Sequence, residues 1–145
     1  MKIAVTQAQL QSNIHYCSNQ ISESSSRIKN LEKKLEDYYE GLKKHNSSKQ
    51  SFDDFMHAQQ TSANKVSGAA SDFKFMQGYS NSMRDLLTGN RRRKAEDSFY
   101  EMETKIKSAI ANTEQEIAAE KRNLYNLNNK LDSLQYELRK LMMNS

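Results

Sequence analysis

The sequence predicts an all-α protein, and three observations lead to this prediction. The 145-residue chain has no proline and only four glycines, so the residues that most strongly interrupt helices are almost absent. Its mean hydropathy of −0.94 is strongly polar. Its apolar residues recur at alternating steps of three and four, the spacing of helices that share narrow apolar seams. We therefore expect one domain over residues 1–145, an elongated three-helix antiparallel bundle or coiled coil.

The first helix is expected from about residue 2 to 44. Its seam consists of Ile3, Leu10, Ile14, Cys17, Ile21, Ile28, Leu31, Leu35, Tyr38 and Leu42, interrupted by Gln7 and Ser24. A stripe of this regularity faces a partner helix. The polar stretch HNSSKQS, residues 45–51, predicts a loop by its composition. Ser51, followed three residues later by Asp54, predicts an N-cap that starts the next helix.

The second helix is expected from about residue 52 to 87. Its stripe consists of Phe52, Phe55, Met56, Ala63, Val66, Ala70, Phe73, Met76, Met83 and Leu87. Gly89 then fits the position just after a helix, and Asn90 suits the N-cap of the next one. The turn at residues 88–90 therefore predicts a helix-turn-helix hairpin at Leu87–Gly89.

The third helix is expected from about residue 91 to 142, because this segment lacks both Gly and Pro. Its seam consists of Phe99, Met102, Ile106, Ile110, Thr113, Ile117, Glu120, Leu124, Leu127, Leu131, Leu134, Leu138 and Leu141. In the simplest arrangement this helix folds back along the second one. Its leucine-rich distal half then pairs antiparallel with the first helix.

Motifs for chemistry are missing from the sequence. It contains no glycine-rich phosphate loop, no His or Cys pair at metal-ligand spacing and no nucleophile motif. We therefore expect no enzymatic activity, no cofactor and no metal site. The one cysteine, Cys17, rules out an intrachain disulfide. The start of the chain has no signal-peptide pattern, and no window is apolar enough for a membrane span. We expect a cytoplasmic protein, and any export would not use a Sec signal.

Four cations, Arg91–Lys94, follow Gly89 at the start of the third helix, where the helix dipole favours anions. Three interpretations compete for them. They can be a solvated charge run with partners such as Glu96 one turn on. They can bind phosphate groups, which would make the protein a weak nucleic-acid binder. They can also form a docking tip for an acidic partner surface.

The pattern helix, LLTGN, helix resembles the hairpin of the WXG superfamily of small type VII secretion proteins. Leu87-Thr88-Gly89 stands where those proteins have Trp-x-Gly. The layout is more similar still to the small helical proteins associated with LXG-domain toxins. This resemblance implies a partner or targeting chaperone that binds the N-terminal LXG domain of a bacterial toxin and promotes its export. It leaves open a second small helical partner and export of the protein itself through type VII secretion.

The leading hypothesis is therefore a non-enzymatic helical partner of such a toxin. Its candidate binding residues are Leu86, Leu87, Gly89, Arg91, Arg92, Arg93 and Phe99. A self-associating coiled-coil scaffold, for example a homodimer, is the first alternative. Nucleic-acid binding through Arg91–Lys94 is the second.

Overall fold

The structure of the chain is a computed structural model that describes residues 2–69 and 74–144. It consists of three α-helices in the order α1 (Lys2–Ala69), α2 (Lys74–Thr88) and α3 (Asn90–Met143). These described residues contain no strand. The all-α prediction is confirmed.

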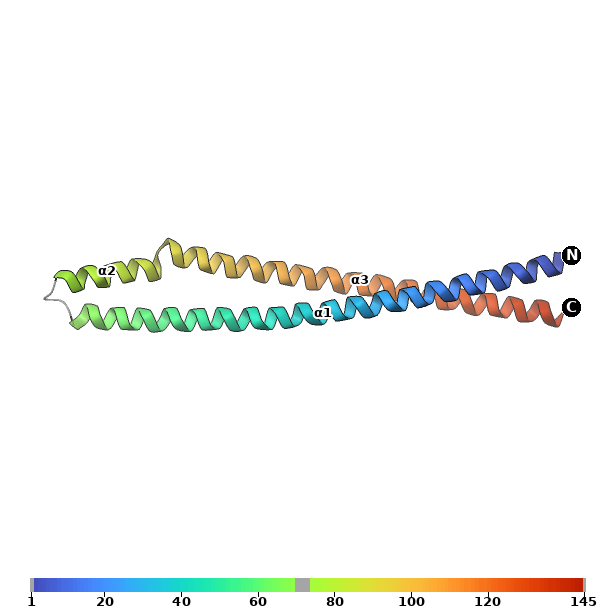
Figure 1. Cartoon of the computed structure of the whole chain (residues 1–145), viewed down its shortest axis with the longest axis horizontal. Coiled ribbons are helices and arrows are strands. Elements are labelled where there is room, and N and C mark those ends of the chain that lie inside the picture. Colours follow the sequence, from blue (N-terminus) through green and yellow to red (C-terminus); the bar gives the residue numbers. More distant parts are fainter. Residues whose placement is uncertain (1, 70–73, 145) are drawn as a thin grey trace. The chain divides into compact units, whose positions relative to one another are not determined.

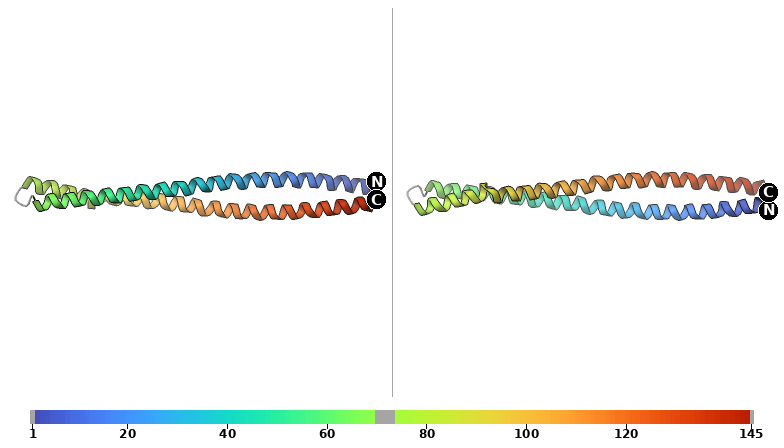
Figure 2. Two further views of the ribbon diagram at one scale, coloured as in Figure 1. Left: turned by 90° about the horizontal axis from the view of Figure 1, so that it is seen from below. Right: turned by 90° about the horizontal axis from the view of Figure 1, so that it is seen from above.

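The chain divides into two compact units, and α1 and α3 each contribute to both. Unit 1 comprises Met1–Asp37 and Ile110–Ser145, and unit 2 comprises Tyr38–Ala109. In unit 1, the first part of α1 and the second part of α3 lie side by side and antiparallel (Figure 2). The predicted pairing of the leucine-rich segment with the N-terminal helix is confirmed. Folding as one domain stays a prediction.

The core of unit 1 is the narrow seam that the heptad pattern predicts. Its buried side chains are Leu10, Cys17, Ser24 and Ile28 from α1 and Ile110, Thr113 and Ile117 from α3. The leucines from residue 124 to 141 are half-buried in the same stripe. Half-burial is what a two-helix pairing allows, because each seam residue is covered from one side only.

A polar pair sets the register within unit 1. Ser24 is fully buried, and its hydroxyl donates a hydrogen bond of 2.7 Å to Oε1 of Glu120. Both residues stand on the predicted seams, so the polar residue in one seam is the hydrogen-bond partner of the polar residue in the other. Two turns along, the Cys17 thiol lies 3.3 Å from the carbonyl oxygen of Leu127. A register shift would leave the Ser24 hydroxyl buried without an acceptor, which costs about 1–3 kcal/mol.

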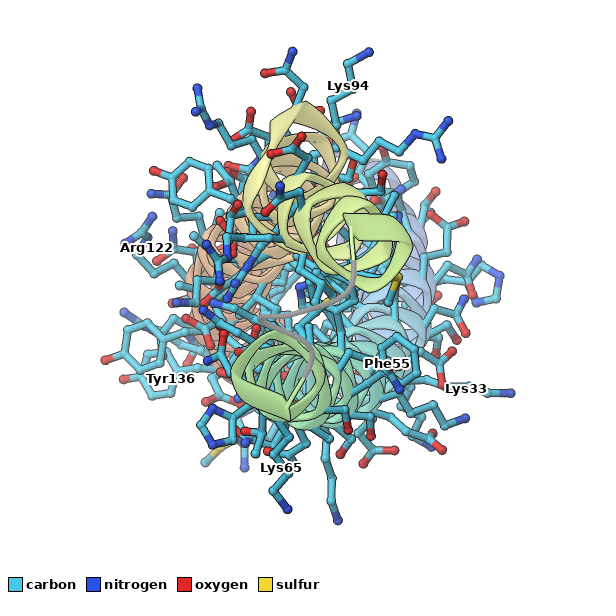
Figure 3. The ribbon with its side chains drawn as sticks, turned by 90° about the vertical axis from the view of Figure 1, so that its left-hand side faces the viewer. Lys33, Phe55, Lys65, Lys94, Arg122 and Tyr136 are labelled. Atoms are coloured by element: carbon cyan, nitrogen blue, oxygen red, sulfur yellow. The ribbon has the colours of Figure 1, made fainter. Side chains whose placement is uncertain are left out.

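In unit 2, the second part of α1 runs antiparallel to α2 and to the start of α3 (Figure 1). Met56 and Ala63 of α1 pack with Leu87 of α2 in a small buried cluster, and Phe52 and Met83 cover it. This core is much smaller than a globular one. Charged side chains such as Lys65 and Lys94 point away from the helices (Figure 3).

The predicted loop at residues 45–51 is wrong, because α1 continues through it without interruption. The stretch contains neither Gly nor Pro, so its polar residues lower helix propensity by only a few tenths of a kcal/mol each. His45, the first residue of the stretch, and Phe52, which follows it, both contact Phe99 of α3. Ser51 is therefore not an N-cap, and Asp54 instead accepts a hydrogen bond from Gln50 one turn earlier.

The predicted hairpin at Leu87–Gly89 is also wrong, and a three-helix bundle is not confirmed. Leu87 packs against α1, and α3 continues along α1 beyond a bend at Gly89 (Figure 1). α2 runs antiparallel to α1 (Figure 1). The helix predicted over residues 52–87 also includes Ala70 and Phe73, which lie outside the described residues, as do the side chains of Val66 and Met76.

Two predicted core residues of unit 2 are exposed. Met102 is 52% exposed and Phe55 is 58% exposed, whereas Glu103 is half-buried. The seam of α3 thus passes through Glu103, seven residues before Ile110. The Glu103 carboxylate pairs with Lys107 at 2.8 Å, which lets a charged residue occupy this position and leaves Met102 beside the core.

Candidate partner-binding surface

A shallow apolar groove of about 350 Å³ lies between α1 and α3 in unit 2. It is lined by His45, Phe52, Ala95, Ser98, Phe99 and Met102. The two α1 residues are seven apart, and the α3 residues follow helical steps of three and four, so each set shares one face of its helix. The Phe99 ring contacts the ring of Phe52 at 5.3 Å between centroids, a tilted arrangement that favours aromatic packing.

His45 brings a polar atom into this apolar surface. Its ring lies 5.6 Å from that of Phe99. Its Nε2 atom is buried and has no hydrogen-bond partner among the described residues. A nearby carboxylate, Glu103, is held in its charged form, because the hydrogen bond and the positive charge of Lys107 lower its pKa. The groove thus combines apolar ring surface with one buried nitrogen that has no hydrogen-bond partner among the described residues.

The bend at Gly89 explains where the cations lie. The Gly89 amide donates to the Asp85 carbonyl oxygen at 2.7 Å, and the Arg93 amide donates to Gly89 at 3.3 Å. The hydrogen-bond ladder therefore continues almost unbroken from α2 into α3. No described glycine has a positive φ, so Gly89 is not the left-handed cap that the sequence predicts. The negative end of the α2 dipole lies beside the positive end of α3 and offsets it.

Arg92 supports the bend itself. Its Nε donates to Glu96 at 2.9 Å, and its Nη1 donates to the carbonyl oxygen of Leu87 at 3.3 Å. A guanidinium group on the last carbonyls of a helix satisfies acceptors that have no partner within the helix. Arg92 is therefore tied to α2. The side chains of Arg91, Arg93 and Lys94 are exposed and have no ion-pair or hydrogen-bond partner in the part of the chain that the structure describes.

The seven sequence-predicted binding residues do not form one accessible site. Leu87 is 3% exposed and belongs to the core, whereas Leu86 is 42% exposed. Gly89 and Arg92 build the bend, and Arg91 and Arg93 project from it. Only Phe99 lines the groove. Their role in partner binding stays a prediction.

Sequence reasoning missed most of the groove, because His45 fell in the predicted loop and Phe52 and Met102 were assigned to core seams. The signal that could have found it is the seven-residue step from His45 to Phe52. That step continues the heptads of the N-terminal seam through the polar stretch.

Unit 1 carries a second cluster of functional groups around Glu120, whose side chain is 20% exposed. Oε1 of Glu120 accepts hydrogen bonds from Ser24, from Arg27 at 3.1 Å and from Asn123 at 3.3 Å. These hydrogen bonds, that of Ser24 most strongly, lower the pKa of Glu120. The cluster is satisfied within the chain, so it favours a structural role.

Within residues 2–69 and 74–144, no group of three or more His, Cys, Asp or Glu side chains is placed to hold a metal ion. None of the helices in the same ranges has an apolar stretch long enough to cross a bilayer. Comparison of the chain with protein-family models, curated protein sequences and solved structures gave no match.

Proposed function

We propose that this protein is a non-enzymatic helical partner protein that binds the LXG domain of a type VII secretion toxin and promotes its export. The exposed apolar surface of unit 2 carries the proposal. Met102, which lines the groove, and Phe55 on α1 are each more than half exposed. Covering such side chains with another helix is favourable by roughly 25 cal/mol per Å² of apolar area removed from water. The choice of an LXG domain as partner rests on the sequence resemblance at Leu87-Thr88-Gly89.

The exposed area supports a binding role. The chain exposes 10921 Å², whereas a compact protein of 16.8 kDa exposes about 7,700 Å². A standard interface needs about 800 Å² from each partner, so the surplus is large enough for one. The seams of unit 1 cover one another, as the contact of Ser24 with Glu120 indicates. The surface that we propose for a partner is the one around the apolar groove of unit 2.

Co-expression tests this proposal. The full chain is produced with the N-terminal LXG domain of a candidate toxin and passed over a size-exclusion column. We expect the two to elute together as a complex of defined mass, because both contribute helices to one core. The controls are each protein alone and the full chain with an unrelated helical domain. Separate elution from every LXG domain tested would contradict the proposal.

The self-associating scaffold predicts a different result. Light scattering of the isolated chain would then give the mass of a stable dimer or larger assembly, and an LXG domain would not change it. Nucleic-acid binding is left with three free cations in this cluster, since Arg92 is held by Glu96 and Leu87. A retardation assay at moderate salt, with Arg91 and Arg93 replaced by Ala, tests it.

A further inference from the structure

The two units contain corresponding grooves with opposite chemistry. The residue just before the first core position of each heptad flanks the core. Because the helices are antiparallel, these flanking residues of α1 and α3 lie on the same side of the core, which is the side that carries the groove. In unit 1 these positions include Arg27 and Glu116, which line a groove of about 400 Å³. In unit 2 they include Ala95 and Met102, which line the apolar groove. The steps of seven along each helix then give the remaining positions on this side.

In unit 1 half of these positions are charged. They include Arg27 and Lys34 of α1 and Glu116 and Lys130 of α3. In unit 2 they carry no charge. We call them the unit 2 face, which consists of Gly41, Ser48, Phe55, Ala95, Met102 and Ala109. Flanking positions of two-stranded coiled coils are commonly Glu or Lys, so unit 2 departs from a pattern that unit 1 of the same chain keeps.

The unit 2 face has the properties of a surface that another helix covers. Burying its residues removes no charged group from water, whereas covering the flanks of unit 1 would desolvate several charges. Gly41, Ala95 and Ala109 are small, which lets a helix backbone approach closely. A Cβ atom added to Gly41 would meet no heavy atom within 4 Å. Phe55 and Met102 supply the large exposed side chains that fill a partner's grooves.

The rim of this face is basic. One position further from the core, again at steps of seven, stand Arg91, Ser98 and Lys105 on α3 and Lys44, Ser51 and Ala58 on α1. Every charge in this row is positive. The one recorded ion pair in it, Lys44 with Glu40, joins side chains that are 77% and 65% exposed, and such pairs contribute little. Two copies packed through this face would bring like charges together, so the rim disfavours a symmetric homodimer.

We propose that the unit 2 face binds an amphipathic helix of a different protein, whose apolar stripe is bordered by Asp or Glu. The apolar stripe packs between α1 and α3 as a third helix, and the acidic borders meet Arg91, Lys105 and Lys44. As the binding site for an LXG domain, this face rests on the proposed function. As a receptor for an acidic amphipathic helix, it is tested independently of any toxin.

The test uses the full chain and two synthetic, stapled helices of about three heptads. Both helices carry the same leucine stripe, and they differ only in having Glu or Lys at the bordering positions. Fluorescence anisotropy gives the Kd of each. We expect the Glu-bordered helix to bind at least about tenfold more tightly than the Lys-bordered one. Equal affinity for the two helices, or no binding of either, would overturn the proposal.

A pair of matched variants locates the site. The double substitution Phe55→Gln with Met102→Gln changes the unit 2 face. The control, Tyr39→Gln with Tyr100→Gln, changes two exposed aromatic residues of unit 2 that occupy the flanking positions on the other side of the same core. We expect the first variant to weaken binding of the Glu-bordered helix at least about tenfold and the second to change it less than about twofold. The opposite ranking would place the site elsewhere.

Two further measurements keep the outcomes distinct. Circular dichroism of both variants should match the wild type, since all four side chains are exposed. Light scattering of the isolated chain should give a monomer. A dimer that the Phe55 and Met102 substitutions dissociate would assign the face to a second copy and overturn the proposal. If the Glu-bordered helix binds at this face but no LXG domain does, the proposed toxin partner is contradicted, whereas the proposal that the face binds an acidic amphipathic helix is supported.

Discussion

At the residue scale, the clearest structural feature is the buried contact between Ser24 and Glu120. Each is a polar residue in a mostly apolar seam, and the pattern of either seam alone does not explain it. Together they form a hydrogen bond of 2.7 Å, and Arg27 approaches the same carboxylate at 3.0 Å. Buried polar groups that satisfy only one alignment fix the register of a coiled coil. The sequence alone does not select this pair, because Gln7 and Thr113 are further polar residues of the same seams.

The contact makes stability depend on pH. The hydrogen bonds lower the pKa of Glu120 in the folded protein below its ordinary value of 4.5. The carboxylate therefore stabilises the fold above about pH 4.5, and this contribution is lost as the pH falls through the lower folded-state pKa. We expect Glu120→Gln to lower the free energy of unfolding by about 1–3 kcal/mol at neutral pH. The difference in free energy of unfolding between this variant and the wild type should be smaller at about pH 3.

Urea denaturation followed by circular dichroism measures both values. Glu116→Gln is the control, since Glu116 is an exposed carboxylate on the same helix. The difference in free energy of unfolding between Glu116→Gln and the wild type should depend less on pH than that of Glu120→Gln. A difference between wild type and Glu120→Gln that stays constant from neutral to acid pH would contradict the expected loss.

At the scale of elements, the seams were predictable and the reversal of the chain was not. Heptad spacing located the paired segments of unit 1 because burial repeats with the helix period. Gly89 and Asn90 suggested a reversal because their residue types are typical of helix ends. Local propensity cannot distinguish a bend from a reversal, since both interrupt a helix. The pairing of α1 with α3 can make this distinction. The residue numbers of its two contacting pairs, Ser24 with Glu120 and Cys17 with Leu127, add to the same value. Half of that value, the midpoint of the pairing, lies after the end of α1 and before the start of α2, whereas Gly89 lies beyond it.

The glycines provide a test of the bend. A Cβ atom at Gly89 would overlap the carbonyl oxygen of Asp85, which accepts the hydrogen bond that continues the ladder. We expect Gly89→Ala to destabilise the protein by about 1–3 kcal/mol, as overpacking does. Gly41→Ala should stabilise it by about 1 kcal/mol, because its site is open and Ala favours a helix interior.

Thermal unfolding of the two variants, recorded at 222 nm as in any helical protein, separates these effects. Gly78→Ala is a second open-site control, because a Cβ atom there also meets nothing within 4 Å. If Gly89→Ala raised the melting temperature as the controls do, the bend would not need a glycine.

At the scale of the whole molecule, the charge balance and the exposed area bear on association. The net charge is +4, and Arg91 and Lys105 place positive charge on the rim of the unit 2 face. Opposite charges accelerate association, and salt screens them over about 8–10 Å. Composition alone could not identify this site, since 22 basic and 18 acidic residues are spread along the chain. It is the register that sorts them into a charged flank in unit 1 and an uncharged one in unit 2.

A charge reversal tests this steering. In the double variant Arg91→Glu with Lys105→Glu, we expect the association rate with the Glu-bordered helix to fall at least about tenfold at low salt. We also expect it to lose most of its dependence on salt, while the dissociation rate changes less. Stopped-flow fluorescence across a range of ionic strength measures both rates. Arg122→Glu with Arg139→Glu, on unit 1, is the matched control and should leave the association rate within about threefold.

The burial of Cys17 has a consequence for redox chemistry. This sulfhydryl is the only one in the chain, it is 2% exposed, and the paired helices of unit 1 shield it. Forming a disulfide requires a thiolate to reach another sulfur atom. While unit 1 stays closed, two copies cannot be cross-linked in this way. Thiol–disulfide exchange therefore does not act on the folded protein.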